Sequence, residues 1–277
     1  MFWPSPGNRT VSSPASRALA AGASVDAVRH AIRSSRWQII LTGIYATFDG
    51  PLAHIHRLRA ALLHSGAESM ITGVTACKLV GLKYVPHDLG FVDTLVDARR
   101  RPSDMGHVRV NRTSRLPKPT WWADTSSAEA ARDLDQAPPW WVPGDDLAPT
   151  ARRWTLPIAP QHRAAIDAVR FHSLSLAKAG PPEPWRTAEL LRDTRALLCE
   201  VVQRRRCSVA DLVAEYDATP RPGTAHIRRA LDDVAAGCRS APECDLRDLV
   251  RAIRVLPEPM WNQQLPGYGL GCCGAGR

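Results

Sequence analysis

Arginine side chains in residues 29–36 are the clearest candidates for chemistry in this sequence, and the chemistry they favour is phosphate and base recognition. Arg29 and Arg33 are four residues apart, His30 lies between them, and Arg36 follows three residues later. Residues four apart in a helix lie on the same face. Arginine presents several N–H donors that match phosphate oxygens and the edge of guanine. The spacing therefore predicts a DNA-contacting surface formed by Arg29, His30, Arg33 and Arg36.

Two short helices are predicted to position these side chains. Ser13, which is followed by a proline, can cap a first helix that ends near residue 22. Ser24 can cap a second helix, whose outward face carries the arginines. The inward face of the second helix is expected to be apolar and to contain Val25, Val28 and Ile32.

A β-ribbon is predicted directly after the second helix. Residues 37–41 and 44–48 read as strands joined by a turn at Thr42 and Gly43. Two helices followed by a ribbon are the element order of a winged helix-turn-helix, in which a helix enters the major groove of DNA. In that arrangement Thr42 lies near the DNA backbone. The alternative is a plain packing unit of two helices without a DNA-binding role.

A second group of basic residues lies at 99–118, where seven Lys and Arg side chains accompany one aspartate. The net charge of the whole chain is +9, and most of it falls in this group and in residues 1–60. Two basic regions on a nearly neutral chain indicate a polyanionic partner, with double-stranded DNA as the first candidate. The alternative is a genome whose composition favours arginine codons. The residues predicted to add phosphate contacts are Arg99, Arg100, Arg101, Arg109 and Arg112.

The remaining sequence predicts an α+β protein of two globular units and part of a third. Residues 51–117 read as a mixed α/β segment in which strand 107–112 is the outer strand. Residues 118–162 contain two Trp-Trp pairs among prolines. They are read as a connection held to the body by its tryptophans, with a base-stacking platform as the alternative. Residues 163–237 read as helices, and the Arg204–Arg206 run is expected to be a solvated helix end.

Metal, disulfide and membrane functions are not favoured by the sequence. Seven cysteines include no Cys-x-x-Cys pair, and His54, His56 and His64 have no carboxylate or cysteine at ligand spacing. We expect no cofactor and no metal. The chain lacks an apolar run of 18 residues and a signal-peptide pattern, so we expect a soluble cytoplasmic protein without a membrane partner.

Several stretches together resemble one family. AGASVDAVRHAIRSSRWQIILTGIYATFDGP, IHRLRAALLHSG and ITGVTACKLVGL are similar to the N-terminal winged helix of actinobacterial AbiEi-type antitoxin-like regulators and the segments that follow it. ALLCEVVQRRRCSVADLVAE and RRALDDVAAGCRSAPECDLRDLVRAIRVLPEPMWNQQL resemble the form in which this module precedes a DUF559 domain. That domain is related to very-short-patch-repair endonucleases of the PD-(D/E)xK fold. The resemblance implies a transcriptional regulator that binds its own promoter, with a cognate toxin or regulatory protein as a possible partner.

The resemblance also implies a nuclease-like domain that this sequence does not complete. Glu243 occupies the place of the first acidic residue, and a strand is expected to begin at Trp261. Beyond it, the metal-binding Asp and Glu-x-Lys groups have no counterparts, because Glu258 is the last acidic residue and Lys178 the last lysine. We therefore expect no enzymatic activity. The alternative is a DUF559-type endonuclease-related protein inactivated by truncation, a non-functional remnant.

The predicted organisation follows from these readings. Its ranges are 1–10 (disordered), 11–50 (winged helix-turn-helix), 51–117 (mixed α/β), 118–162 (Trp/Pro-rich connection), 163–237 (helical), 238–265 (truncated nuclease-like stub) and 266–277 (disordered tail).

Overall fold

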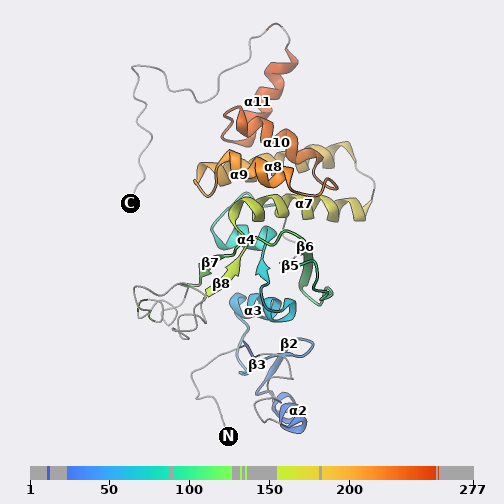
Figure 1. The fold of residues 1–277 in the computed structure, drawn as a ribbon, viewed down its shortest axis with the longest axis vertical. Helices are drawn as coiled ribbons and strands as arrows, with labels where there is room; N and C mark the ends of the chain where they lie inside the picture. The colour runs from blue at the N-terminus through green and yellow to red at the C-terminus, as the bar shows by residue number, and fades with distance from the viewer. Residues whose placement is uncertain are drawn as a thin grey trace. The chain divides into compact units, whose positions relative to one another are not determined.

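The computed structural model describes residues 11–12, 24–87, 90–126, 132, 135, 155–180, 183–253 and 255 (Figure 1). The predicted α+β class is confirmed, because helices are combined with a small antiparallel sheet and a larger mixed sheet. The predicted disordered ends, the first predicted helix and the strand expected at Trp261 lie outside the described residues. The chain divides into two compact units, Met1–Gly81 with Asp88–Ala164, and Leu82–His87 with Ala165–Arg277.

The first unit begins with a three-stranded antiparallel sheet and one helix. The strands pair in the order β1-β3-β2, and the predicted ribbon with its turn at residues 42–43 is confirmed. Strand β1 was not predicted, because two residues carry too little pattern to mark a strand. The bounds are β1 Val11–Ser12, α2 Val25–Arg33, β2 Gln38–Leu41 and β3 Ile44–Ala46.

Helix α2 forms because its first turn is capped and one face is apolar. The hydroxyl of Ser24 accepts a hydrogen bond from the N–H of Ala27 at 3.1 Å, as the sequence predicted. Val28 and Ala31 are buried. Val25, which we expected on the buried face, lies in the first turn of α2 and is 49% exposed.

Helix α3, His54–Ser65, packs against the ribbon and against the larger sheet. Its buried residues include Ile55 and Leu58, and the two ribbon strands that it contacts contain the buried Leu41 and Ile44. His56 caps its own helix, because its Nδ1 accepts the N–H of Ala53 at 3.1 Å. The small sheet and the following α/β segment are therefore parts of one unit.

The larger sheet has five strands in the order β6-β5-β4-β8-β7. Strands β5 and β6 are parallel, as are β4 and β8, whereas β4 with β5 and β7 with β8 are antiparallel. The prediction that the strand near residues 107–112 lies at the edge is confirmed. The bounds are β4 Met70–Ile71, β5 Val92–Asp97, β6 Val108–Thr113, β7 Thr120–Ala123 and β8 Thr155–Ile158, with helix α4 at Gly73–Leu79.

Strands β7 and β8 correct the reading of residues 118–162 as a connection. Residues 120–123 and 155–158 form a strand pair in which Trp121 lies opposite Pro157 and Trp122 opposite Leu156. The pairing joins segments more than thirty residues apart, so a local sequence pattern cannot predict it. Tryptophans of β7 are thus strand residues, and the second Trp-Trp pair lies outside the described residues.

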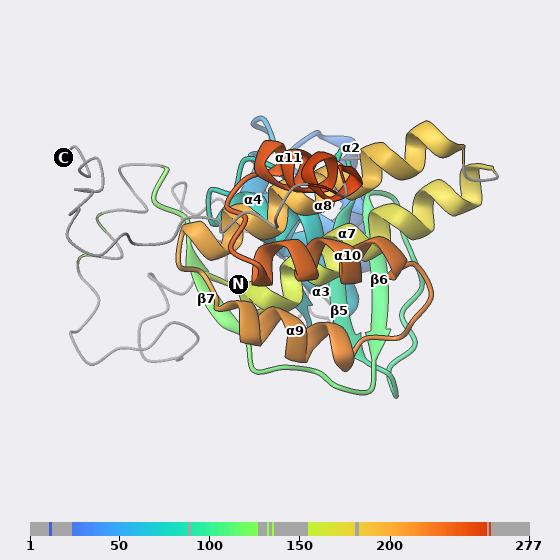
Figure 2. The same ribbon diagram turned by 90° about the horizontal axis from the view of Figure 1, so that it is seen from above.

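The second unit is helical and is built around α8. Both α10 and α11 pack against α8, and α9 packs against α10 (Figure 2). Its core contains side chains exposed by 2% or less, among them Leu197, Leu198, Leu212, Ile227 and Leu231. The bounds are α7 Gln161–Ala179, α8 Pro184–Gln203, α9 Val209–Asp217, α10 Ala225–Ala235 and α11 Ala241–Ala252.

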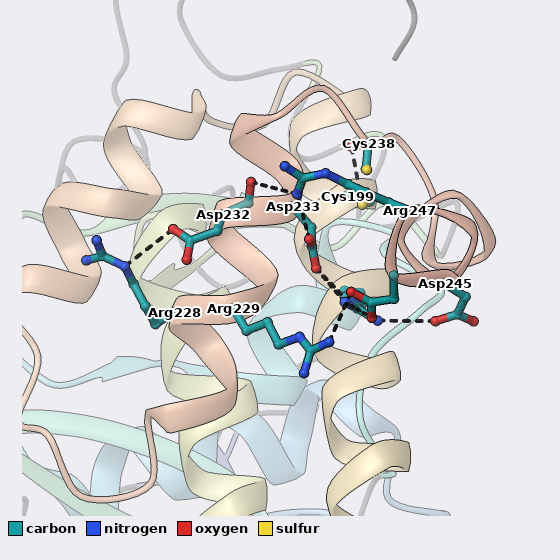
Figure 3. A network of polar contacts seen from close by, with 10 residues as sticks. Cys199, Arg228, Arg229, Asp232, Asp233, Cys238, Asp245 and Arg247 are labelled. Carbon is teal, nitrogen blue, oxygen red and sulfur yellow. Dashed lines mark hydrogen bonds and ion pairs between the residues drawn. The ribbon is translucent and has the colours of Figure 1, made fainter. Parts of the chain in front are cut away.

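Helix α11, which opens the range predicted as a nuclease-like stub, is joined to its neighbours by buried ion pairs. Asp233 of α10 binds Arg247 of α11 at 2.8 Å (Figure 3) and Arg195 of α8 at 2.6 Å. Arg195 also binds Asp248 of α11 at 2.6 Å. The described part of this range is therefore a constituent of the helical unit.

Candidate nucleic-acid interface

The outer face of α2 carries the predicted basic side chains. Arg29, His30 and Arg33 are exposed, and they lie on the side of the helix away from the buried Val28 and Ala31. Arg29 makes an ion pair of 3.5 Å with Asp26, but the side chains are 69% and 89% exposed. Such an exposed pair contributes little to stability and leaves the guanidinium accessible. The geometry suits a face that contacts a polyanion.

Arg36 follows α2 through a tight helix end. The N–H of Ser35 donates to the carbonyl of Ile32, and the N–H of Arg36 donates to the carbonyl of Ala31 at 3.0 Å. This pair of bonds is a Schellman motif, in which Ser35 takes the left-handed conformation with φ of 54°. Arg36 is exposed and its Nε donates to the hydroxyl of Ser34. The helix end thus holds Arg36 between α2 and the ribbon.

The ribbon presents a polar turn and an apolar outer face. Thr42 is exposed, and Gly43 follows it with φ of 80°, a value that favours glycine. Ile39 lies opposite Tyr45 and is 60% exposed, while Trp37 stacks near Tyr45 with ring centroids 6.2 Å apart. Thr42 is therefore accessible at the tip, as the winged-helix reading requires.

In the second basic region, Arg99 is engaged by a neighbouring carboxylate. Its Nε and Nη2 donate to the two oxygens of Asp97 at 2.9 and 3.1 Å. The hydrogen bond from the Arg99 side chain is the main reason that the pKa of Asp97 falls to about 2. Asp97 is therefore ionised at neutral pH and offsets the charge of Arg99, although the Arg99 side chain is 91% exposed.

Arg100 packs against the end of α3, whereas Arg101 and Arg112 are exposed. Nη1 of Arg100 lies 2.7 Å from the place where a Cβ on Gly66 would stand. Gly66 has φ of 90°, a conformation that favours glycine, and a Cβ there would also displace the end of the Arg100 side chain. Arg101 and Arg112 are therefore accessible to phosphate.

Arg109 differs from the others, because it pairs with a buried carboxylate. Its Nη2 lies 2.8 Å from Oδ2 of Asp93, whose side chain is 3% exposed, and its guanidinium lies over the ring of Phe91 at 4.9 Å. The other carboxylate oxygen of Asp93 accepts from Asn111 at 3.2 Å. This cluster neutralises Asp93 inside the sheet, so it gives Arg109 a structural role. Whether Arg109 contacts DNA as well stays a prediction.

The cluster of Asp93, Arg109 and Asn111 was not predicted from the sequence. The one available signal is an acidic residue inside the apolar strand VDTLV at 92–96. Its partners could not be named, because the parallel register that sets Asp93 beside Arg109 is a tertiary feature.

Residues that could hold a metal are not gathered in the part of the chain that the structure describes. His64 shares a hydrogen bond of 2.7 Å with the carbonyl of Ser103. The described cysteines are free thiols, and burial raises the pKa of both Cys207 and Cys238 to about 12. Glu243 lies in the first turn of α11, where its carboxylate accepts the N–H of Arg239 at 2.8 Å and its own N–H donates to the hydroxyl of the N-cap residue Ser240. His64 and Glu243 thus each have a backbone hydrogen-bond partner.

Across the described helices, none is long and apolar enough to cross a membrane.

Comparison with solved structures finds a structural likeness to a mycobacterial protein. No protein-family model matches the chain, and no curated protein matches it. The crystal structure of the RV2827C protein from Mycobacterium tuberculosis aligns with 83% of this chain and 72% of that chain, at 19% sequence identity and a TM-score of 0.43. A likeness of this size defines neither a shared fold nor a shared function.

Proposed function

We propose that this protein is a DNA-binding transcriptional regulator of the antitoxin type, without catalytic activity. The observation that supports the proposal most is the outer face of α2, where Arg29, His30 and Arg33 are exposed and Arg36 follows beside an antiparallel ribbon. An exposed basic helix next to a ribbon is the geometry with which winged helices meet DNA.

The chemistry of recognition follows from this geometry. The α2 arginines reach the major groove, where guanidinium groups bind guanine edges or phosphates. Thr42 at the ribbon tip donates to a backbone phosphate. Arg101 and Arg112 add phosphate contacts from the second basic region. Arg99 contributes less than its exposure suggests, because Asp97 offsets its charge.

The proposed DNA target is the protein's own promoter, as expected for an antitoxin that controls its operon. A cognate toxin or regulatory protein is the second proposed partner, and the cytoplasm is the proposed location. Glu243 gives no support to an endonuclease, since its carboxylate already accepts the N–H of Arg239.

The test is binding of the full chain to its promoter fragment and to a random duplex of the same length. The variant Arg29→Ala/Arg33→Ala removes the α2 contacts, and Arg186→Ala/Arg228→Ala removes two arginines from the helical unit as a matched control. Each lost phosphate contact lowers the slope of log K against log salt by about 0.9. We expect loss of promoter preference only in the α2 variant. Equal binding by both variants would contradict the proposal, and so would plasmid cleavage with Mg²⁺ that Glu243→Ala abolishes.

A further inference from the structure

Basic side chains also lie at the C-terminal end of α8, in the helical unit. Glu200, 4% exposed, accepts the N–H groups of Lys83 and Tyr84, each at 2.8 Å from Oε2. The segment Leu82–His87 belongs to the same unit as α8, although it lies more than one hundred residues away in sequence. A buried carboxylate thus fixes this segment along the helix end.

The fixed segment displays a lysine and an aromatic side chain. Lys83 is exposed and Tyr84 is 62% exposed, whereas Leu82 and Pro86 on either side are buried. Arg204, one turn beyond Glu200, binds its other carboxylate oxygen at 2.8 Å and is 37% exposed. The buried neighbours anchor the segment, so the outward position of Lys83 and Tyr84 is set by the fold.

Helix α8 ends in a Schellman motif with arginine at the position that favours glycine. The N–H of Arg205 donates to the carbonyl of Val202 and that of Arg206 to the carbonyl of Val201. Arg205 has φ of 52°, a left-handed conformation that is strained for a residue with a Cβ. Helix α10 ends in the same motif with Gly237 at this position, at φ of 97°. Helix α2 ends in the motif as well, with Ser35 at this position at φ of 54°. Among the described helices, the motif thus occurs with serine, arginine and glycine at the left-handed position.

The helix dipole does not account for this arginine. Cations near a helix C-terminus are favourable, and Arg204 and Arg206 already supply them. Glycine at position 205 would relieve the strain without removing those two charges. Residues in strained backbone conformations cluster at functional sites.

From these observations we propose that Lys83, Tyr84 and Arg205 bind the phosphate backbone of double-stranded DNA, independently of base sequence. We call these three residues with Arg204 and Arg206 the α8-end surface. The formal charges of Lys83, Arg204, Arg205 and Arg206 together with that of the buried Glu200 sum to +3. Arginine, lysine and tyrosine side chains are among the groups that contact phosphate oxygens in protein–DNA complexes. The inference rests on the proposed function, because it assigns the helical unit the same ligand, double-stranded DNA, as the one proposed for α2.

The strain at Arg205 permits a sharp experiment with the full chain. Arg205→Gly removes the side chain while relieving the backbone, so we expect the melting temperature to rise by about 2 °C. We expect its affinity for a random 40-base-pair duplex to fall severalfold, with a salt slope smaller by about 1. Lys83→Ala/Tyr84→Ala is the second variant and should also weaken this binding, while Arg228→Ala, in an exposed pair of α10, is the matched control.

The outcomes separate this inference from the proposed function. Failure of the proposed function appears as equal wild-type affinity for promoter and random duplex, and the inference still stands if Arg205→Gly lowers both. Unchanged duplex affinity in Arg205→Gly and in Lys83→Ala/Tyr84→Ala overturns the inference, even if promoter preference is intact. Tighter binding of single-stranded RNA than of the duplex, lost in the same variants, overturns the assignment to DNA.

Discussion

Arg195 of α8 and Asp233 of α10 form an ion pair of 2.6 Å, and each side chain is 3% exposed. Asp233 also binds Arg247 of α11, so one buried carboxylate connects three helices (Figure 3). Removing one partner of a buried pair leaves an uncompensated charge in the interior. The network is therefore expected to hold the helical unit together.

Asp233→Asn is predicted to lower the free energy of unfolding by about 3–5 kcal/mol, because Arg195 and Arg247 lose their shared charge partner. Asp232→Asn is the matched control, since its pair with Arg228 is about 60% exposed on both sides. Such an exposed pair is worth about 0–1 kcal/mol. Urea unfolding measures both, and equal losses in the two variants would show that burial of Asp233 is not the cause.

Arg109 and Arg112 lie on one strand and are predicted to respond differently to alanine. Arg109→Ala leaves Asp93 buried without its guanidinium, so we expect a loss of about 2–4 kcal/mol in stability. Arg112→Ala is expected to weaken DNA binding while leaving stability within about 0.5 kcal/mol. Thermal unfolding measures the stability of both variants, and titration with a DNA duplex measures their affinity for DNA. Equal stability of the two would contradict the structural role of Arg109.

Gly66→Ala is predicted to destabilise the first unit, because residue 66 has φ of 90° and the Arg100 side chain occupies the space of a Cβ. The strain of the left-handed conformation alone costs about 1 kcal/mol or more. Gly90→Ala is the matched control, since it has φ of 75° and nothing within 4 Å of its Cβ position. The measurement is the midpoint of urea unfolding. A loss no larger than that of Gly90→Ala would exclude a contribution from Arg100.

His226 gives a pH dependence in the helical unit. Burial is the main cause that lowers the pKa of His226 to about 4, and the nearby His172 adds to it. The unfolded chain takes up a proton near pH 6.5, which the folded chain resists. Stability from this group is thus present above pH 6.5 and is lost as the pH falls toward 4, by about 3 kcal/mol at most.

Unfolding free energies of the wild type and of His226→Gln between pH 7.5 and 4.5 test this assignment. The variant is expected to lose less stability on acidification than the wild type. His87→Gln, at an exposed position of the same unit, is the matched control. Parallel pH profiles for wild type and His226→Gln would rule out His226 as the source.

Local signals in the sequence were enough for α2 and its ribbon. Ser24 marks the first turn of α2, and the Thr42-Gly43 pair marks the turn, because capping and turn formation depend on neighbouring residues. Strands β7 and β8 were not predicted, since their pairing spans a long stretch of chain and their tryptophans and prolines suggested a connection. A local sequence pattern does not identify strand partners that lie so far apart in the chain.

The candidate site was likewise predicted from the sequence only in part. Exposure of Arg29 and Arg33 followed from helical spacing, because the opposite face was apolar. The ion pair of Arg109 with Asp93 did not follow from helical or strand spacing, since it depends on the register of β5 against β6. The left-handed backbone at Arg205 was also not predicted, because position 205 lacks glycine, the residue that usually marks this conformation.

Binding of the full chain to its own promoter fragment across a salt series tests the central claim most directly. The account predicts tighter binding to the promoter than to a random duplex, an affinity that falls steeply with salt, and loss of the promoter preference in Arg29→Ala/Arg33→Ala. Equal affinity of the wild type for both DNAs, or an unchanged preference in that variant, would contradict it.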